Sequence, residues 1–137
     1  MNKADYLFRI SLKCLIRNEK GEVLVVKENG RDWWDLPGGG MDHGENVKTA
    51  LAREMKEEVS LTGEFSYHIV HVDEPTHFDS RDIWQIRLVF EVIPENLVFE
   101  VGEDGDEVMF SSIDTFKDSD KPAEQRLHAC VQGIKSK

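Results

Sequence analysis

Four glutamates, a glycine-rich loop and the start of a helix fall within one short stretch of the chain, residues 39–61. Glu54, Glu57 and Glu58 are spaced so that a helix would carry all three within an arc of about 100°. Like charges three and four residues apart repel one another and destabilise a helix unless a cation lies between them. Because ligands that offer only oxygen suit a hard cation, the pattern predicts a site for Mg²⁺ or Mn²⁺.

Closely spaced carboxylates on a rigid element are what the hydrolysis of a phosphoanhydride requires. The substrate is polyanionic, and divalent ions neutralise its phosphate oxygens and lower the pKa of a water molecule. Gly38, Gly39 and Gly40 precede the predicted helix. Glycine has no Cβ and accepts unusual dihedrals, so these residues are expected to bring the backbone close to the metal and the phosphates. The alternative is a solvated helix face that carries ion pairs and binds nothing.

The same stretch resembles the signature of the Nudix hydrolase family. In that signature a glycine is followed after five residues by Glu and, after seven more, by Arg-Glu-hydrophobe-any-Glu-Glu-any-Gly-hydrophobe. Gly39, Glu45 and the segment 53–61 (REMKEEVSL) match every defining position except one. Ser60 stands where the family has glycine, and a serine in a left-handed C-cap conformation would cost about 1 kcal/mol. Upstream, residues 36–39 (LPGG) look like the sequence that usually leads into this motif.

The resemblance implies a metal-dependent enzyme of the MutT-like kind, which cleaves a phosphoanhydride bond in a nucleoside diphosphate linked to a further group. Glu54, Glu57 and Glu58 would then be metal ligands, together with the carbonyl oxygen of Gly39. Arg53 would orient these carboxylates through ion pairs, for which its planar and always charged guanidinium is suited. Glu54 is one candidate for the general base, and the family varies in which carboxylate takes that role.

A further metal ligand often comes from a later loop in this family. The acidic segment 102–107 (GEDGDE) supplies four candidates, of which Glu107 is preferred because it directly precedes the hydrophobic run 108–110. The other three are Glu103, Asp104 and Asp106. An acidic surface turn built around the two glycines of this segment is an equally good interpretation.

The substrate is expected to be a small nucleotide, with a (deoxy)nucleoside triphosphate first because the domain is minimal. A nucleotide sugar or ADP-ribose is the alternative substrate. Two alternative functions are a non-catalytic nucleotide sensor on the same fold and an acidic protein-interaction domain. Trp33 is a candidate for stacking on a base, since ring stacking tolerates any base. Arg81 is a candidate for a phosphate contact, although surface charge is the preferred interpretation. Trp84 is expected to lie in the core.

The bulk properties fit one domain spanning all 137 residues. A net charge of −10 argues against a purely electrostatic grip on a nucleic-acid polymer or an anionic membrane. Cys14 and Cys130 lack the spacing of a metal motif, and two reduced thiols are expected. The sequence has no apolar run of about 18 residues, so a cytoplasmic protein is expected, either a monomer or a homodimer.

The pattern of apolar residues predicts strands that surround a central helix, with a second helix near the end of the chain. Asn46 is the expected N-cap of the first helix, and Val47, Leu51 and Met55 form its buried stripe, with the carboxylates on a different face. The fold class is therefore α+β, and the resemblance implies a Nudix-type mixed β-sheet sandwiched between α-helices. The expected strands are 6–17 and 22–27, joined as a hairpin, then 64–72, 82–92 (central), 97–101 and 108–111; the helices are 47–59 and 122–134, and 31–40 is a loop.

Overall fold

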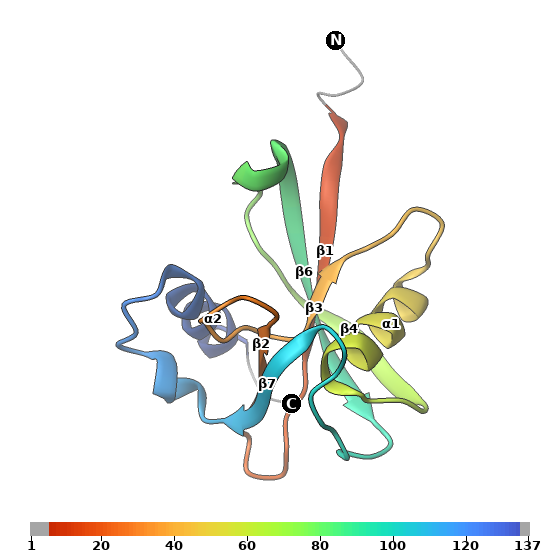
Figure 1. Cartoon of the computed structure of the whole chain (residues 1–137), viewed down its shortest axis with the longest axis vertical. Coiled ribbons are helices and arrows are strands. Elements are labelled where there is room, and N and C mark those ends of the chain that lie inside the picture. Colours follow the sequence, from red (N-terminus) through yellow and green to blue (C-terminus); the bar gives the residue numbers. More distant parts are fainter. Residues whose placement is uncertain (1–5, 135–137) are drawn as a thin grey trace.

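The computed structural model describes residues 6–134, in which two β-sheets and two α-helices are arranged around a pair of long parallel strands (Figure 1). The first helix begins and ends where the sequence predicts, and the second is two residues shorter at its C-terminal end. The strands are β1 (Phe8–Leu15), β2 (Val23–Glu28), β3 (Gly38–Gly40), β4 (Phe65–Val72), β5 (Thr76–Phe78), β6 (Ile83–Pro94) and β7 (Gly105–Ser111). The helices are α1 (Val47–Val59) and α2 (Pro122–Gln132), with short 3₁₀ turns at Asp79–Arg81 and Ile113–Phe116.

The larger sheet is mixed, in the order β3-β1-β6-β4, and β5 also pairs with β6. β1 and β6 run parallel, with Leu12 opposite Leu88, whereas β3, β4 and β5 each run antiparallel to their partners. The prediction that residues 82–92 form a central strand is confirmed, because β6 pairs on both sides. The smaller sheet contains β2 and β7 alone.

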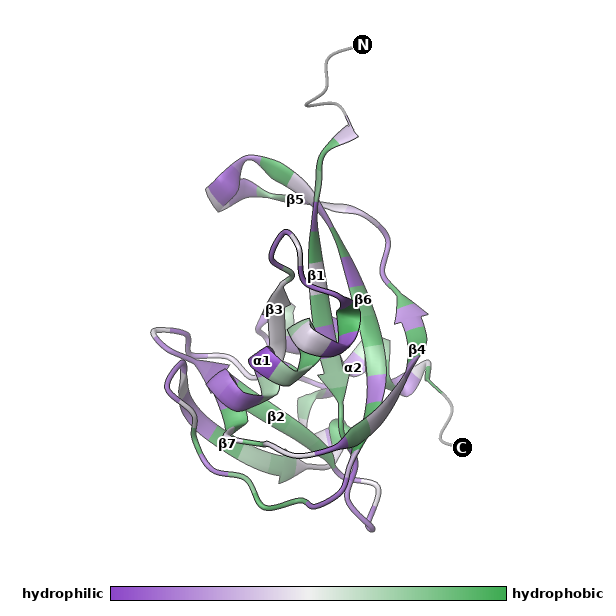
Figure 2. Ribbon diagram, turned by 90° about the vertical axis from the view of Figure 1, so that its right-hand side faces the viewer, coloured by the Kyte–Doolittle hydropathy of each residue, from purple (hydrophilic) through white to green (hydrophobic). Residues whose placement is uncertain are grey.

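The two helices cover opposite faces of the β1–β6 pair, as Figure 1 shows. Leu12 of β1 packs in one hydrophobic cluster with Leu51 of α1, whereas Leu15 packs in a second cluster with Leu127 of α2. Successive side chains of a strand point to opposite faces, so Leu12 and Leu15, three positions apart, lie on opposite faces of the sheet. Each face is therefore covered by one of the two helices. Figure 2 shows the hydrophobic residues along β1, β2 and β6. The expected α+β sandwich is confirmed.

The predicted hairpin of residues 6–17 and 22–27 is wrong in its pairing. The turn itself forms, since the amide of Asn18 donates to the carbonyl of Glu22 over 3.0 Å and Arg17 bridges to Val23. Beyond this point the two strands enter different sheets. Both edges of β1 are occupied by β3 and β6, so β2 has no free edge there and pairs with β7 instead.

Two shorter expectations are also wrong. Residues 97–101 do not form a strand; this segment passes the end of α1, where the amide of Glu100 donates to the carbonyl of Val59 over 3.1 Å. Residues 31–40 are not entirely loop, because Gly38–Gly40 pairs with β1 as β3. Gly38 has φ +143°, and a Cβ there would overlap the carbonyl oxygen of Leu12, so only glycine fits this approach.

Helix α1 has well-defined caps at both ends. The side chain of Asn46 accepts a hydrogen bond from the amide of Thr49 over 2.8 Å, which confirms the predicted N-cap. At the other end Ser60 is left-handed, with φ 56°, and its amide donates to the carbonyl of Lys56 over 3.2 Å, as in an αL C-cap. Within residues 6–134 no helix is long and apolar enough to span a membrane.

Candidate functional site

Helix α1 presents its three glutamates to a cleft of about 380 Å³ whose floor is formed by the glycines of β3. Glu54, Glu57 and Glu58 line this cleft on the helix side. The structure thus brings together the helix acids and the glycines that the sequence singles out. The remaining lining residues come from other parts of the chain: Arg9, Glu28, Asn29, Arg31, Arg81 and Asp104.

Arg53 connects the helix acids to the loop before the helix. Its guanidinium donates to both carboxylate oxygens of Glu45 at 2.8 Å, to Glu54 at 3.0 Å and to the carbonyl of Gly40 at 3.0 Å. A longer contact of 3.4 Å reaches Glu57. The hydrogen bonds from Arg53 hold the pKa of Glu45 at about 2, so this carboxylate stays ionised at neutral pH. The network fixes the position of Glu54 relative to β3.

Two of the three helix acids are buried, contrary to the expectation that they lie on a face apart from the core. Glu54 is only 7% exposed and Glu58 only 3% exposed. Glu54 lies about one helical turn and Glu58 about two turns from Ala50, and the two acids are next to Met55 and Val59, so the acidic stripe and the apolar stripe overlap at the helix edge. Core packing and the site therefore share this edge of α1.

Burial changes the protonation of these acids. Burial raises the pKa of Glu54, and Arg53 counteracts this only in part. For Glu58, burial and the adjacent carboxyl of Glu28 outweigh Lys13 and raise the pKa to about 10. The backbone N–H of Gly38 also donates to the Glu58 carboxylate. A positive charge in the cleft would allow both buried carboxylates to ionise.

The chemistry of this donor set fits a hard divalent cation. Every side-chain donor on α1 is a carboxylate oxygen, and an added Cβ on Gly39 would lie 2.9 Å from Glu54, so the β3 backbone is already close to the acids. In residues 6–134 the group of three donors within 4.8 Å of one another is a different one, His71, Asp73 and Cys130. Asp73 lies 3.8 Å from Arg87, and burial raises the pKa of Cys130 to about 11, so that group suits an ion pair and a neutral thiol.

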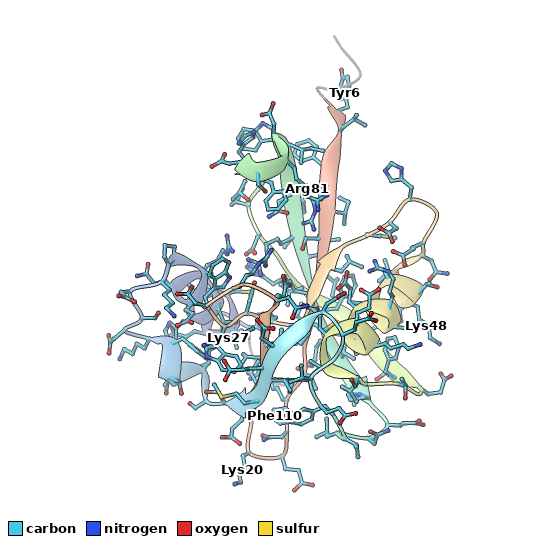
Figure 3. The ribbon with its side chains drawn as sticks, in the orientation of Figure 1. Tyr6, Lys20, Lys27, Lys48, Arg81 and Phe110 are labelled. Atoms are coloured by element: carbon cyan, nitrogen blue, oxygen red, sulfur yellow. The ribbon has the colours of Figure 1, made fainter. Side chains whose placement is uncertain are left out.

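The other predicted residues are distributed between the cleft and the surface. Arg81 lines the cleft and lies beside the N-terminal half of β1, as Figure 3 shows. Trp33 does not line the cleft, and its ring lies against the guanidinium of Arg31 at 5.5 Å. Glu107 lies in β7, where it forms an ion pair of 3.4 Å with Lys27, so the structure does not bring it to the cleft. From the later acidic segment it is Asp104 that reaches the cleft.

Trp84 is 52% exposed, so the expectation that it belongs to the core is wrong. It lies near the start of β6, opposite Phe8 of β1 and His77 of β5. Figure 1 shows this end of the β1–β6 pair projecting beyond both helices. No helix covers the ring there, and its edge-on contact with His77 at 5.6 Å is a surface contact.

Sequence reasoning missed the cations that face the glutamates, above all Arg9 and Arg31. The alternation in β1 contained a usable signal, because Arg9, Ser11 and Lys13 are the polar positions between the apolar residues Ile10, Leu12 and Cys14. Ser11 and Lys13 are nevertheless buried, at 3% and 4% exposure. A buried polar row of this kind indicates a lined pocket rather than a solvated strand face.

Comparison with known proteins identifies the family of this chain. The chain matches the NUDIX domain over residues 7–129 and therefore belongs to that family. An RNA pyrophosphohydrolase from Ruthia magnifica subsp. Calyptogena magnifica is 32% identical over 93 residues, which cover 56% of this chain and 52% of that protein. The chain thus matches about half the length of this curated relative.

Solved structures show the same fold at lower sequence identity. The MutT protein from Methanosarcina mazei Go1 is 24% identical, with a TM-score of 0.68, over 89% of this chain and 91% of that one. The MutT NUDIX hydrolase from Burkholderia pseudomallei is 19% identical, with a TM-score of 0.73, over 94% and 99%. These likenesses support the architecture described above.

Proposed function

We propose that this chain is a metal-dependent pyrophosphohydrolase that cleaves a phosphoanhydride bond in a nucleoside diphosphate linked to a further group. The observation that carries the proposal is the division of charge across one cleft. Glu54, Glu57 and Glu58 line the α1 side, and the cations Arg9, Arg31 and Arg81 line the same cleft from other elements. Acids that hold a metal and cations that hold phosphates are the two halves of a site for a phosphoanhydride.

The three helix glutamates and the carbonyl oxygen of Gly39 would hold Mg²⁺ or Mn²⁺, with Asp104 in place of Glu107 as the ligand from the later loop. A divalent ion there supplies neutralisation of the phosphate charge and lowers the pKa of a nearby water. Asp104 is held at this position by its own amide, which donates to the carbonyl of Glu57 over 2.9 Å.

The protein's own residues would perform the remaining tasks. Arg81 and Arg9 would bind phosphate oxygens from the side opposite α1, while Gly38–Gly40 allows the substrate to approach the backbone. Arg53 would keep Glu54 oriented as the candidate general base, because the guanidinium donates to Glu54 and Glu45 at the same time. Trp33 would act only indirectly, by packing on Arg31.

The substrate we propose first is a (deoxy)nucleoside triphosphate, with a nucleotide sugar or ADP-ribose as the alternative. The curated relative bears the name of an RNA pyrophosphohydrolase, so RNA with a 5′-triphosphate end also belongs in the test. The net charge of −10 disfavours extended contacts with an RNA chain, which makes a small nucleotide the better candidate.

The test is product release from a panel of these substrates with Mg²⁺ or Mn²⁺, for the natural chain and for Glu58→Gln. We expect one substrate class to be turned over and the variant to be inactive. We also expect Glu58→Gln to be at least as stable as the natural chain without metal, because a neutral amide can keep the hydrogen bond from Gly38. Unfolding of the variant, seen in a thermal melt, would instead give Glu58 a structural role. Metal binding without turnover of any substrate would favour a nucleotide sensor.

A further inference from the structure

A second and smaller pocket adjoins the cleft on the face of the sheet that α2 covers. We call it the cationic pocket. It has a volume of about 120 Å³ and shares Arg9, Glu28, Arg31 and Gly39 with the cleft. Its other lining residues come from β1, β5, β6, α2 and the segment before β3, and none comes from α1: Ser11, Lys13, Asp35, Phe78, Gln85, Arg87 and Arg126.

Positive charge exceeds negative charge in the cationic pocket, where five cations and two carboxylates form the lining. Asp35 lies 3.5 Å from Lys13 and 3.2 Å from Arg87, so one carboxylate serves two cations. The second carboxylate, Glu28, is 2.6 Å from Arg31 and 3.9 Å from Lys13. The acids of the pocket are therefore already engaged.

Two arginines of the pocket have no carboxylate within 4.0 Å among residues 6–134: Arg9 and Arg126. Arg9 is held in place by Gln85, to which it donates over 2.8 Å, and by the ring of Phe78 at 4.9 Å. Arg126 remains exposed on α2, and its partial desolvation together with the nearby Arg87 lowers its pKa. The Nε atom of Arg87 is buried without a hydrogen-bond partner, and the carboxylate of Asp73 lies 3.8 Å from it. Crowded, partly desolvated guanidinium groups with free donors form a receptor for an anion.

The size and lining of the pocket exclude a nucleoside. Its volume is well below the roughly 300–1,000 Å³ of pockets that enclose a drug-sized ligand. A cavity of about 690 Å³ on another side of the cleft is better suited to a base and ribose, because Phe8, Ile10, Met41 and Ile83 contribute apolar walls to it. It shares Arg9, Gly40 and Arg81 with the cleft, so one extended substrate could occupy both.

We propose that the cationic pocket binds a phosphate group of the substrate that lies outside the cleaved anhydride. The inference rests on the proposed function, because it takes the cleft as the place of cleavage. It narrows the substrate class to nucleotides that carry a further phosphate at the end remote from the nucleoside. That phosphate is either the distal one of a nucleoside triphosphate or a monoester on a linked sugar.

The first experiment measures the binding of inorganic phosphate in metal-free buffer, by calorimetry and by the NMR signals of the arginine Nε–H groups. We expect saturable binding with shifts of the Arg87 and Arg126 signals. Arg126→Gln should weaken binding roughly tenfold, and Arg126→Lys should weaken it less. Lys117→Gln is the control, since it also removes an exposed cation near α2, but one that does not line the pocket.

The absence of saturable phosphate binding, or equal binding by Arg126→Gln and the natural chain, would overturn the proposal. Because neither metal nor turnover is involved, this result is independent of the proposed function. If the chain turns over no substrate but its pocket still binds phosphate, the proposed hydrolase activity is contradicted, whereas the phosphate site is not.

The second experiment compares KM and kcat of Arg126→Gln for a nucleoside triphosphate and for a sugar-linked nucleoside diphosphate with and without a phosphate monoester. A rise in KM for the triphosphate alone identifies its distal phosphate as the occupant. A rise confined to the phosphorylated sugar identifies the monoester. An equal rise for all three, including the substrate without a further phosphate, would overturn the proposal.

Discussion

Ser60 is the residue at which this chain departs from the glycine of its family's motif. Its φ of 56° lies in the left-handed region, where a Cβ is unfavourable, and the amide of Ser60 still donates to the carbonyl of Lys56 over 3.2 Å. Its hydroxyl makes only a long contact of 3.4 Å with the carbonyl of Val101. The helix therefore ends as the motif requires, at the cost of backbone strain.

Ser60→Gly is expected to raise the free energy of unfolding by about 1 kcal/mol, because glycine adopts this conformation without a steric penalty. Urea denaturation measures the change. Ser60→Ala is the control, since it keeps the Cβ and removes the weak hydroxyl contact, and it should leave stability nearly unchanged. A loss of stability in Ser60→Gly would show that the hydroxyl contact outweighs the strain.

Asp35 is the buried carboxylate that neutralises Lys13 and Arg87. Burial alone would raise its pKa, but these two cations outweigh it and lower the pKa from 3.8 to about 2. A depressed carboxylate pKa contributes stability that is present above the unfolded value and is lost as pH falls towards the folded value. The contribution of Asp35 is thus complete above about pH 4 and disappears between about pH 4 and pH 2.

Asp35→Asn should destabilise the protein by roughly 3–5 kcal/mol at neutral pH, because it leaves Lys13 and Arg87 buried without their nearest carboxylate. The difference in free energy of unfolding between the variant and the natural chain should shrink as the pH falls from 4 to 2. Chemical denaturation at a series of pH values measures it. A difference that does not change with pH would mean that Asp35 is not ionised in the native protein.

At the scale of elements, the segment between β6 and β7 completes the C-terminal end of α1. The amides of Glu100, Gly102 and Asp104 donate to the carbonyls of Val59, Glu58 and Glu57 in that order. These are carbonyls that the helix itself leaves without partners. The segment therefore holds the end of the helix that carries two of the site's glutamates.

Gly102→Ala tests this contact, because a Cβ at position 102 would overlap the carbonyl group of Glu57. We expect a loss of roughly 1–3 kcal/mol in the free energy of unfolding, as for an overpacked core site. Gly133→Ala is the control, since a Cβ there has no neighbour closer than 3.5 Å, and it should be nearly neutral. Equal stability of the two variants would show that the segment is not tightly packed on α1.

The sequence predicts well those structural elements that depend on neighbouring residues only. The N-cap Asn46 and the spacing of Leu51 and Met55 are sufficient to place α1, because a helix satisfies its own backbone within one segment. Residues 97–101 have the composition of a strand, yet they pair with no strand, and the amide of Glu100 binds the helix end instead. The hairpin prediction failed for the same reason, since strand pairing depends on which edges the rest of the sheet leaves free.

In the candidate site, too, the local part could be predicted from the sequence and the non-local part could not. The acids of α1 and the glycines of β3 lie within one motif, whereas Arg9 and Arg31 reach the cleft from segments that only the fold brings together. Which of Glu107 and Asp104 lines the cleft depends on the path of the later loop. That path is set by the hydrogen bonds to α1, which no local pattern encodes.

At the scale of the whole molecule, a chain with a net charge of −10 concentrates cations on one side of the cleft and in the pocket beside it. The surrounding negative field disfavours extended polyanions, and the local cations offer a place for a small one. The molecule thus places an acidic helix edge beside a basic pocket, as the proposed metal and phosphate sites require.

Metal-dependent turnover of a nucleoside triphosphate by the natural chain and by Glu57→Gln tests the central claim most directly. Glu57 is the most exposed of the three helix acids, so its replacement should leave the fold intact. Glu19→Gln, which removes an acid from an exposed turn, is the matched control. The account predicts turnover that requires Mg²⁺ or Mn²⁺, persists in Glu19→Gln and is lost in Glu57→Gln. Turnover that is unchanged in Glu57→Gln, or that proceeds without a divalent ion, would contradict it.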